Sequence, residues 1–131
     1  ESAFSGCTSL TSIVIPEGVT EIGIGAFNGC TSLISITIPD SVTSITSAFD
    51  GCTSLTSIVI PSGVTSIEES TFRNCSSLTS ITVNATTPPQ LGSNVFNGST
   101  CPIYVPASRV DTYKAADGWS YYASRIQAIQ T

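Results

Sequence analysis

The chain repeats itself with a period of about 23 residues. Its five Phe residues lie at positions 4, 27, 49, 72 and 96, and its five Cys residues lie at positions 7, 30, 52, 75 and 101. No Phe or Cys lies out of phase with this repeat. Two residue types recurring at one period indicate a chain built from copies of one structural unit. The sequence therefore predicts a solenoid, in which each turn of chain packs on its neighbours.

The length and residue pattern of the unit indicate which class of structural repeat it belongs to. The period is too short for paired-helix repeats of ~33–47 residues or propeller blades of ~40–45, but lies within the leucine-rich-repeat range of ~20–29. Each unit carries a Leu followed by alternating β-branched residues, as in Leu10-x-x-Ile13-x-Ile15, which predicts a short strand. The proline that follows, as at Pro16, ends the strand because it has no N–H to donate. We expect each turn to give one strand to a parallel sheet, with Leu, Ile, Phe and Cys facing inward.

One family shares this arrangement of aromatic, thiol, leucine and proline positions. The second unit reads Ala26-Phe27-Asn28-Gly29-Cys30-Thr31-Ser32-Leu33-Ile34-Ser35-Ile36-Thr37-Ile38-Pro39, followed by Val42-Thr43-Ser44-Ile45. The pattern resembles the BspA-like, or Treponema pallidum-type, leucine-rich repeats over residues 3 to about 105. We predict a right-handed, β-rich (α/β) leucine-rich-repeat solenoid of about 4–5 repeats of 22–24 residues. Its parallel sheet would lie on the concave face, and its C-terminal cap would be partly helical.

The resemblance also implies a function and a location. Family members are typically secreted or surface proteins of bacteria and some parasitic protists, and they look like adhesins. It implies a non-catalytic, monomeric module that is extracellular or at the cell surface and binds host matrix or cell-surface proteins. Two alternatives are a structural spacer that displays another domain and a glycan-binding accessory module using the region of Tyr104, Tyr113 and Trp119. Because the chain lacks an initiator Met and opens partway through a repeat, we expect it to be an N-terminally truncated fragment.

The composition changes after residue 84, and all four Tyr and the Trp lie at position 104 or later. Residues 103–105 repeat the strand-then-proline pattern and should form a fifth strand. Residues 107–117 predict a helix, with Ser108 as its N-terminal cap and Gly118 as its end. A further helical turn and an extended piece should follow from Trp119 to Ile129. We therefore divide the chain into a solenoid at 1–106 and a cap at 107–131, since a solenoid needs its open end covered.

Composition excludes several function classes. The chain has no His, which removes the commonest general base and metal ligand. Its net charge of −5 argues against nucleic acid as a partner. The acidic pairs Glu68–Glu69 and Glu17/Glu21 do not indicate a glycosidase, and a solvated surface is the simpler interpretation. No apolar run approaches the ~20 residues of a membrane helix. We expect no catalytic residue, metal site, cofactor or membrane insertion.

The cysteine ladder does not have the spacing of a zinc site, whose ligands come in closely spaced pairs. Adjacent turns of a parallel sheet lie roughly 4.8 Å apart, so a disulfide between turns is within reach. The Cys residues nevertheless occupy core positions, where free thiols behave as small hydrophobic groups. The pattern favours buried, unpaired and inert thiols and leaves a bridge open.

The outward face of the strands is the candidate partner-binding surface. Alternate residues of a strand point to opposite sides, so inward Ile13 and Ile15 place Ser12 and Val14 outward. The same phase gives the full set of predicted contact residues: Ser12, Val14, Ser35, Thr37, Ser57, Val59, Ser80, Thr82 and Tyr104. This strip lacks the Trp and Arg typical of strong interfaces. We expect weak, multivalent binding here, with the convex loops or no ligand at all as alternatives.

Overall fold

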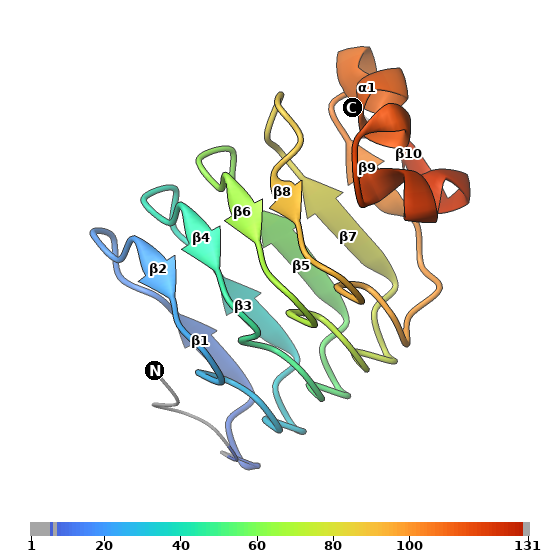
Figure 1. Ribbon diagram of the computed structural model, residues 1–131. Helices are drawn as coiled ribbons and strands as arrows, with labels where there is room; N and C mark the ends of the chain where they lie inside the picture. Colours follow the sequence, from blue (N-terminus) through green and yellow to red (C-terminus); the bar gives the residue numbers. More distant parts are fainter. Residues whose placement is uncertain (1–5, 7, 130–131) are drawn as a thin grey trace.

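The molecule is a stack of turns whose strands form parallel sheets along two sides (Figure 1). The computed structural model describes residue 6 and residues 8–129. The longer strands are β1 (Ser12–Val14), β3 (Ser35–Thr37), β5 (Ser57–Ile60), β7 (Ser80–Val83), β9 (Ile103–Val105) and β10 (Ile126–Ala128). The shorter strands, of two residues each, are β2 (Glu21–Ile22), β4 (Ser44–Ile45), β6 (Ser66–Ile67) and β8 (Gln90–Leu91).

The strand register places equivalent residues of successive turns beside one another. Ile58 of β5 pairs with Ile81 of β7, and Ile81 pairs with Ile103 of β9. Ladder hydrogen bonds join the longer strands into a β1–β3 pair and a four-stranded sheet of order β5-β7-β9-β10. Between these two groups, the Thr56 N–H donates to the Ile34 carbonyl at 3.2 Å. The predicted parallel sheet is therefore confirmed.

The core lies between the sheets and is built from stacked identical residues. Phe27, Phe49, Phe72 and Phe96 form a column of nearly parallel rings, with centroids 5.3, 5.2 and 6.0 Å apart in turn. The inward residues of β5, β7 and β9 are buried as predicted, whereas Ile13 and Ile36 at the N-terminal end are half-buried. Phe4 and Cys7, which were expected to extend the Phe and Cys columns, lie outside the described residues.

The turn around each Phe contains two left-handed backbone positions. The position two residues before the Phe has φ of 71° at Gly25, 45° at Ser47, 60° at Ser70 and 60° at Asn94. The position two residues after the Phe has φ of 72° at Gly29, 82° at Gly51, 63° at Asn74 and 95° at Gly98. These bends direct backbone N–H groups at the next turn, where the Gly29 N–H meets the Asp50 carbonyl at 3.0 Å. Each turn is thereby hydrogen-bonded to its neighbour at this edge as well as through the sheets.

The C-terminal segment, residues 107–129, covers the last turn, and we call it the cap. It comprises the 3₁₀ turn η1 (Ala107–Arg109), the helix α1 (Val110–Ala115), the 3₁₀ segment η2 (Trp119–Arg125) and strand β10. β10 pairs in parallel with β9 and so occupies the edge of the sheet. The structure has the predicted fifth strand, helix, further helical turn and final extended piece.

The predicted ends of the cap helix are wrong. Ser108 caps nothing, since neither η1 nor α1 has a side-chain N-cap hydrogen bond. The chain instead turns at Pro106, whose carbonyl accepts from the Arg109 N–H at 2.8 Å, and this 3₁₀ turn leads directly into α1. α1 ends at Ala115, and Gly118, with φ of 79°, precedes η2. Extended backbone at Ala116 ends the helix before the glycine is reached.

Candidate functional site

The outward strip consists of Ser12, Val14, Ser35, Thr37, Ser57, Val59, Ser80, Thr82 and Tyr104. The ladder register brings these residues together in rows. Ser12 pairs with Ser35, and Val14 pairs with Thr37. Val59 pairs with Thr82, which in turn pairs with Tyr104. The rows form a surface of hydroxyl and apolar groups without a charged side chain.

Exposure along the outward strip decreases toward the cap. Val14 and Val59 are 73% and 52% exposed, although both are β-branched apolar residues of a sheet. Ser80, Thr82 and Tyr104 are half-buried. Tyr104 lies beside Gln127 of β10, so the cap adds one polar row to this face. The two exposed valines are therefore its most accessible apolar points.

The aromatic residues of the cap are mostly structural. Trp119 and Tyr113 are fully buried, at 0% exposure. The Trp119 Nε1–H donates to the Pro89 carbonyl at 2.8 Å, and the Tyr113 hydroxyl donates to the Ala85 carbonyl. Burial raises the pKa of Tyr113, so its hydroxyl stays protonated as a donor. Both rings are packed inside the protein, so they are inaccessible for the stacking on glycans that the alternative function needs.

Tyr121 and Tyr122 are adjacent in sequence but have opposite environments. Tyr122 is buried, and its hydroxyl donates to Asn97 Oδ1 at 2.9 Å and accepts from the Phe96 N–H at 3.3 Å. Tyr121 is 82% exposed. Both tyrosines border a hollow between the cap and the fourth repeat. The sequence did not separate Tyr121 from its buried neighbours, since adjacent residues of a 3₁₀ segment carry no periodic burial signal.

Four of the five cysteines are described and all four are buried; Cys52, Cys75 and Cys101 are free thiols. The Cys52 thiol donates to the Phe27 carbonyl at 3.2 Å, and the Cys75 thiol donates to the Phe49 carbonyl at 3.3 Å. Burial raises the pKa of Cys52 to about 12, with the neighbouring Cys30 thiol as a smaller cause. Burial likewise raises the pKa of Cys75 to about 12. Since the thiolate is the reactive form, burial keeps the Cys52 and Cys75 thiols protonated and weakly nucleophilic at neutral pH.

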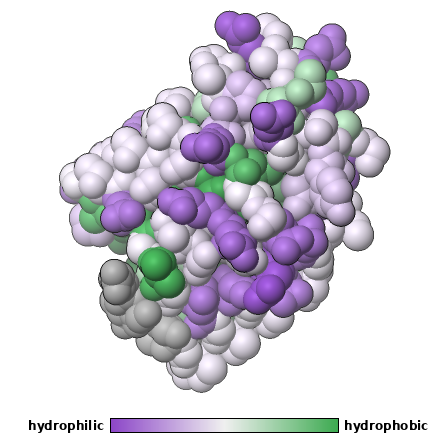
Figure 2. All heavy atoms as spheres, viewed as in Figure 1, coloured by the Kyte–Doolittle hydropathy of each residue, from purple (hydrophilic) through white to green (hydrophobic). Residues whose placement is uncertain are grey.

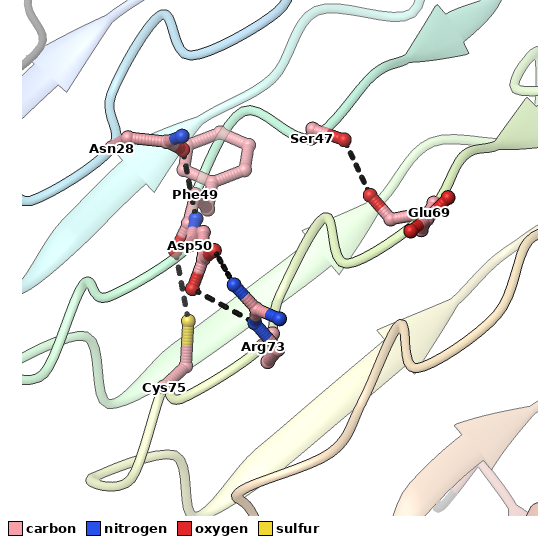
Figure 3. Close-up of polar contacts among 7 residues, drawn as sticks. All are labelled: Asn28, Ser47, Phe49, Asp50, Glu69, Arg73 and Cys75. Carbon is pink, nitrogen blue, oxygen red and sulfur yellow. Dashed lines mark hydrogen bonds and ion pairs between the residues drawn. The ribbon is translucent and has the colours of Figure 1, made fainter.

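Charged and polar side chains join successive turns beside the Phe positions (Figure 3). Arg73 forms an ion pair with Asp50 at 2.7 Å, and this contact raises the pKa of Arg73. Asn28 Oδ1 accepts from the Asp50 N–H at 3.0 Å, which links a third turn to the pair. Ser47 donates to the Glu69 carbonyl nearby. These contacts bridge equivalent turn positions and form part of the scaffold.

The acidic side chains of the described residues are exposed, except Asp50, which is half-buried. Glu68 and Glu69 are both exposed, as predicted, and the Thr46 hydroxyl donates to Glu68 Oε2 at 3.4 Å. Across residues 6 and 8–129, no three His, Cys, Asp or Glu residues gather as a metal-binding group. No helix in the same part of the chain is long and apolar enough to cross a membrane. On the view in Figure 2, hydrophobic colour is limited to small patches among hydrophilic and intermediate residues.

The repeated turns, parallel sheets and stacked core define a leucine-rich-repeat solenoid. The family model described as BspA type Leucine rich repeat region (6 copies) matches residues 1–106, and the chain belongs to this family. The predicted family and solenoid fold are confirmed. Leucine-rich repeats of this kind are protein-interaction modules and are typically non-catalytic, and BspA-type proteins are often secreted or at the cell surface.

Two solved structures are similar to this chain. The T. pallidum leucine-rich repeat protein TpLRR is 34% identical, with a TM-score of 0.75, and the match covers 82% of this chain and 51% of that chain. A leucine-rich repeat protein from Bacteroides ovatus ATCC 8483 is 25% identical, with a TM-score of 0.43, and the match covers 82% of this chain and 46% of that chain. The chain thus spans about half the length of each. No curated protein matches it.

Proposed function

We propose that this chain is the recognition module of a secreted or cell-surface protein, and that it binds a protein ligand through the outward strip. The role is adhesin-like, with a host matrix or cell-surface protein as the partner. The module acts as a monomer and without a cofactor. Its contribution is a rigid, registered surface, which repeat proteins commonly offer to partners.

The observation that carries this proposal is the exposure of Val14 and Val59. Both residues project outward from a sheet whose alternate side chains face the core, so neither valine is part of the buried core. Each is surrounded by Ser and Thr hydroxyls, which can donate and accept hydrogen bonds. The strip therefore suits a partner surface of low charge that presents backbone or hydroxyl groups beside small apolar side chains.

The strip favours modest affinity for each contact. Strong interfaces concentrate their binding energy in Trp, Tyr and Arg anchors, and this surface offers only the half-buried Tyr104 of that kind. Its strength would come from many similar rows acting together. Affinity would then rise when several modules, or several copies of the partner epitope, are linked.

The test is binding of the purified chain to a panel of extracellular matrix proteins. A Val14→Lys, Val59→Lys, Tyr104→Lys variant should lose binding, because it places three charges on an uncharged interface. An Ile24→Lys, Thr53→Lys, Ser108→Lys variant is the charge-matched control, since all three residues are exposed outside the strip. Circular dichroism would verify that both variants keep the fold.

The outcomes separate the candidate functions. Saturable binding that is lost in the strip variant and kept in the control supports the proposal. Equal binding by the two variants would mean that the partner contacts the loops or the cap, and it would contradict binding through the outward strip. Absence of binding across the panel favours a structural spacer over a recognition module.

A further inference from the structure

We propose that the junction between the fourth repeat and the cap is a second binding site, and that it takes a neutral carbohydrate chain. The site consists of two adjoining hollows, which we call the junction cleft. Its lining residues come from β6, β8, the loop after β8 and the cap. Figure 1 shows β8 as the last of the short strands, on the side of the stack nearest the cap. The proposal is independent of the outward strip and adds a different chemical class of ligand.

The first hollow has a volume of about 350 Å³ and lies between the loop that follows β8 and segment η2. Its lining residues are Gly92, Ser93, Asn94, Gly118, Ser120, Tyr121 and Tyr122. The second hollow, of about 480 Å³, shares Gly92 and Ser93 with the first and continues over β6 and β8. It brings Glu68, Glu69 and Gln90 to the same cleft. A chain of several sugar rings can therefore contact both hollows at once.

Tyr121 supplies the aromatic surface that a sugar ring needs. A sugar ring has a face of C–H groups edged by hydroxyls, and an exposed aromatic ring offers a flat apolar surface to that face. Tyr121 is 82% exposed, and its ring lies nearly perpendicular to the Tyr122 ring, with centroids 5.6 Å apart. Tyr122 is itself anchored by its hydrogen bonds to Phe96 and Asn97. The exposed Tyr121 ring therefore packs against a neighbour whose position is fixed by hydrogen bonds.

The groups around Tyr121 match the edge of a sugar. Ser93, Ser120 and Asn94 provide hydroxyl and amide groups that donate and accept hydrogen bonds. Asn94 Oδ1 accepts from Asn97 Nδ2 at 2.9 Å, which fixes the side chain with its amide nitrogen as the remaining donor. Within the described part of the chain, no side-chain hydrogen bond engages Ser93, Ser120 or Gln90. These groups are available to a ligand.

The charge of the junction cleft argues for a neutral ligand. Its lining residues include no Lys or Arg, while Glu68 and Glu69 lie at one end. Sulfated or uronic sugars would be repelled there, whereas a carboxylate can accept hydrogen bonds from hydroxyls of a neutral sugar. A basic peptide would also be attracted by Glu68 and Glu69. However, the hollow that contains Tyr121 has no carboxylate, so the groups on the ring have neutral polar partners.

The backbone of the junction cleft is closely packed. A Cβ on Gly92 would lie 2.5 Å from the Glu69 backbone nitrogen, so this glycine lets the loop after β8 approach the preceding turn. A Cβ on Gly118 would lie 3.1 Å from Leu91 Cβ, so this glycine lets the cap approach β8. A preformed site avoids the cost of ordering its groups on binding.

The experiment uses the full chain and three six-sugar probes, built from glucose, mannose or N-acetylglucosamine. Binding is followed by NMR shift changes and by calorimetry at millimolar sugar. Tyr121→Ala should weaken binding by about tenfold because the stacking surface is lost. Tyr121→Phe should keep it, since the ring remains. Ile34→Ala removes an exposed apolar side chain outside both the junction cleft and the outward strip; it is the matched control and should bind as the parent chain does.

Three results would overturn the proposal. One is the absence of binding to all three oligosaccharides. Another is sugar binding that Tyr121→Ala leaves unchanged. The third is binding of a lysine-rich hexapeptide in place of the sugars, with loss of that binding in a Glu68→Gln, Glu69→Gln variant, which would make the cleft a peptide site. Because Tyr121 is exposed, a folded Tyr121→Ala variant keeps the test decisive.

Discussion

At the scale of single residues, the cysteine position shows how one side chain contributes both packing and a hydrogen bond between successive turns. The position must be small enough to stack in every turn. The Cys52 and Cys75 thiols meet this need and also donate to the Phe27 and Phe49 carbonyls of the preceding turn. These carbonyls accept the Cys30 and Cys52 N–H groups as well, at 3.1 and 3.2 Å, so each thiol adds a second hydrogen bond to a carbonyl that already has one.

The buried thiols lead to a prediction about alkaline stability. The pKa of Cys52 and Cys75 is about 12 in the folded protein, against 9.0 for the exposed thiol. The unfolded state therefore loses its thiol protons first as the pH rises. The free energy of unfolding should be unaffected below pH 9.0 by these groups and should fall between pH 9.0 and about 12. Urea unfolding over this range measures the decrease.

A Cys52→Ala, Cys75→Ala variant is the control for this prediction. It should be less stable at neutral pH, yet its stability should fall less steeply above pH 9.0. In the parent chain, a thiol reagent should label these two residues only after denaturation. Rapid labelling of the native protein, or an equal alkaline slope in the variant, would contradict buried protonated thiols.

At the scale of elements, the turn around each Phe is the part of the repeat with the strictest backbone demands. Its two left-handed positions are occupied by Gly in some repeats and by Ser or Asn in others. Asn tolerates this conformation better than most residues do. Ser47 offsets its strain with hydrogen bonds from its N–H to Thr71 Oγ1 and from its hydroxyl to the Glu69 carbonyl. At the glycine positions, the distance to the neighbouring turn decides whether a Cβ atom can be accommodated.

Gly51 and Gly98 form a matched pair that separates backbone strain from crowding. Both have positive φ, at 82° and 95°. A Cβ on Gly51 has no neighbour closer than 3.7 Å, whereas a Cβ on Gly98 would lie 2.8 Å from Asn74 Cα. Gly51→Ala should cost about 1–2 kcal/mol of unfolding free energy, and Gly98→Ala should cost clearly more. Chemical denaturation of both variants measures the difference, and the reverse order would show that the turns are not this close.

At the scale of the whole molecule, the Phe column joins the repeats to the cap. Phe96, its last ring, packs against Trp119 and Tyr122, with centroids 5.7 and 5.3 Å away. The cap thus continues the core with larger aromatic residues and ends it with hydrogen-bonded polar groups. Arg125 contributes through a hydrogen bond to the Cys101 carbonyl at 2.8 Å. Neighbouring turns depend on each other, as is usual in solenoids.

Removing a ring from the middle of the column should therefore affect the whole stack. Phe49→Ala should lower the free energy of unfolding by roughly 3–5 kcal/mol, because it removes a fully buried aromatic side chain. Phe49→Leu keeps most of the volume and should cost less. Thermal or urea unfolding measures both. A near-zero effect of Phe49→Ala would be incompatible with a stacked core.

The sequence alone determined the features that repeat. Equivalent residues of successive turns stack in register, so the period is enough to predict the parallel sheet, the Phe column, the buried thiols and the family. The outward side chains of β1, β3, β5, β7 and β9 were predicted as a set for the same reason, because strand alternation has a strict period of two. Their role in binding stays a proposal.

Only the tertiary structure decided the features that do not repeat. In the cap, packing against the last turn starts α1 after Arg109 rather than at a Ser108 cap, buries Tyr113 and Trp119, and leaves Tyr121 outside. The junction cleft joins Gly92 and Ser93 to cap residues such as Tyr121, about 30 positions later. No local pattern predicts such neighbours, because the chain meets them once, at the place where the repeat ends.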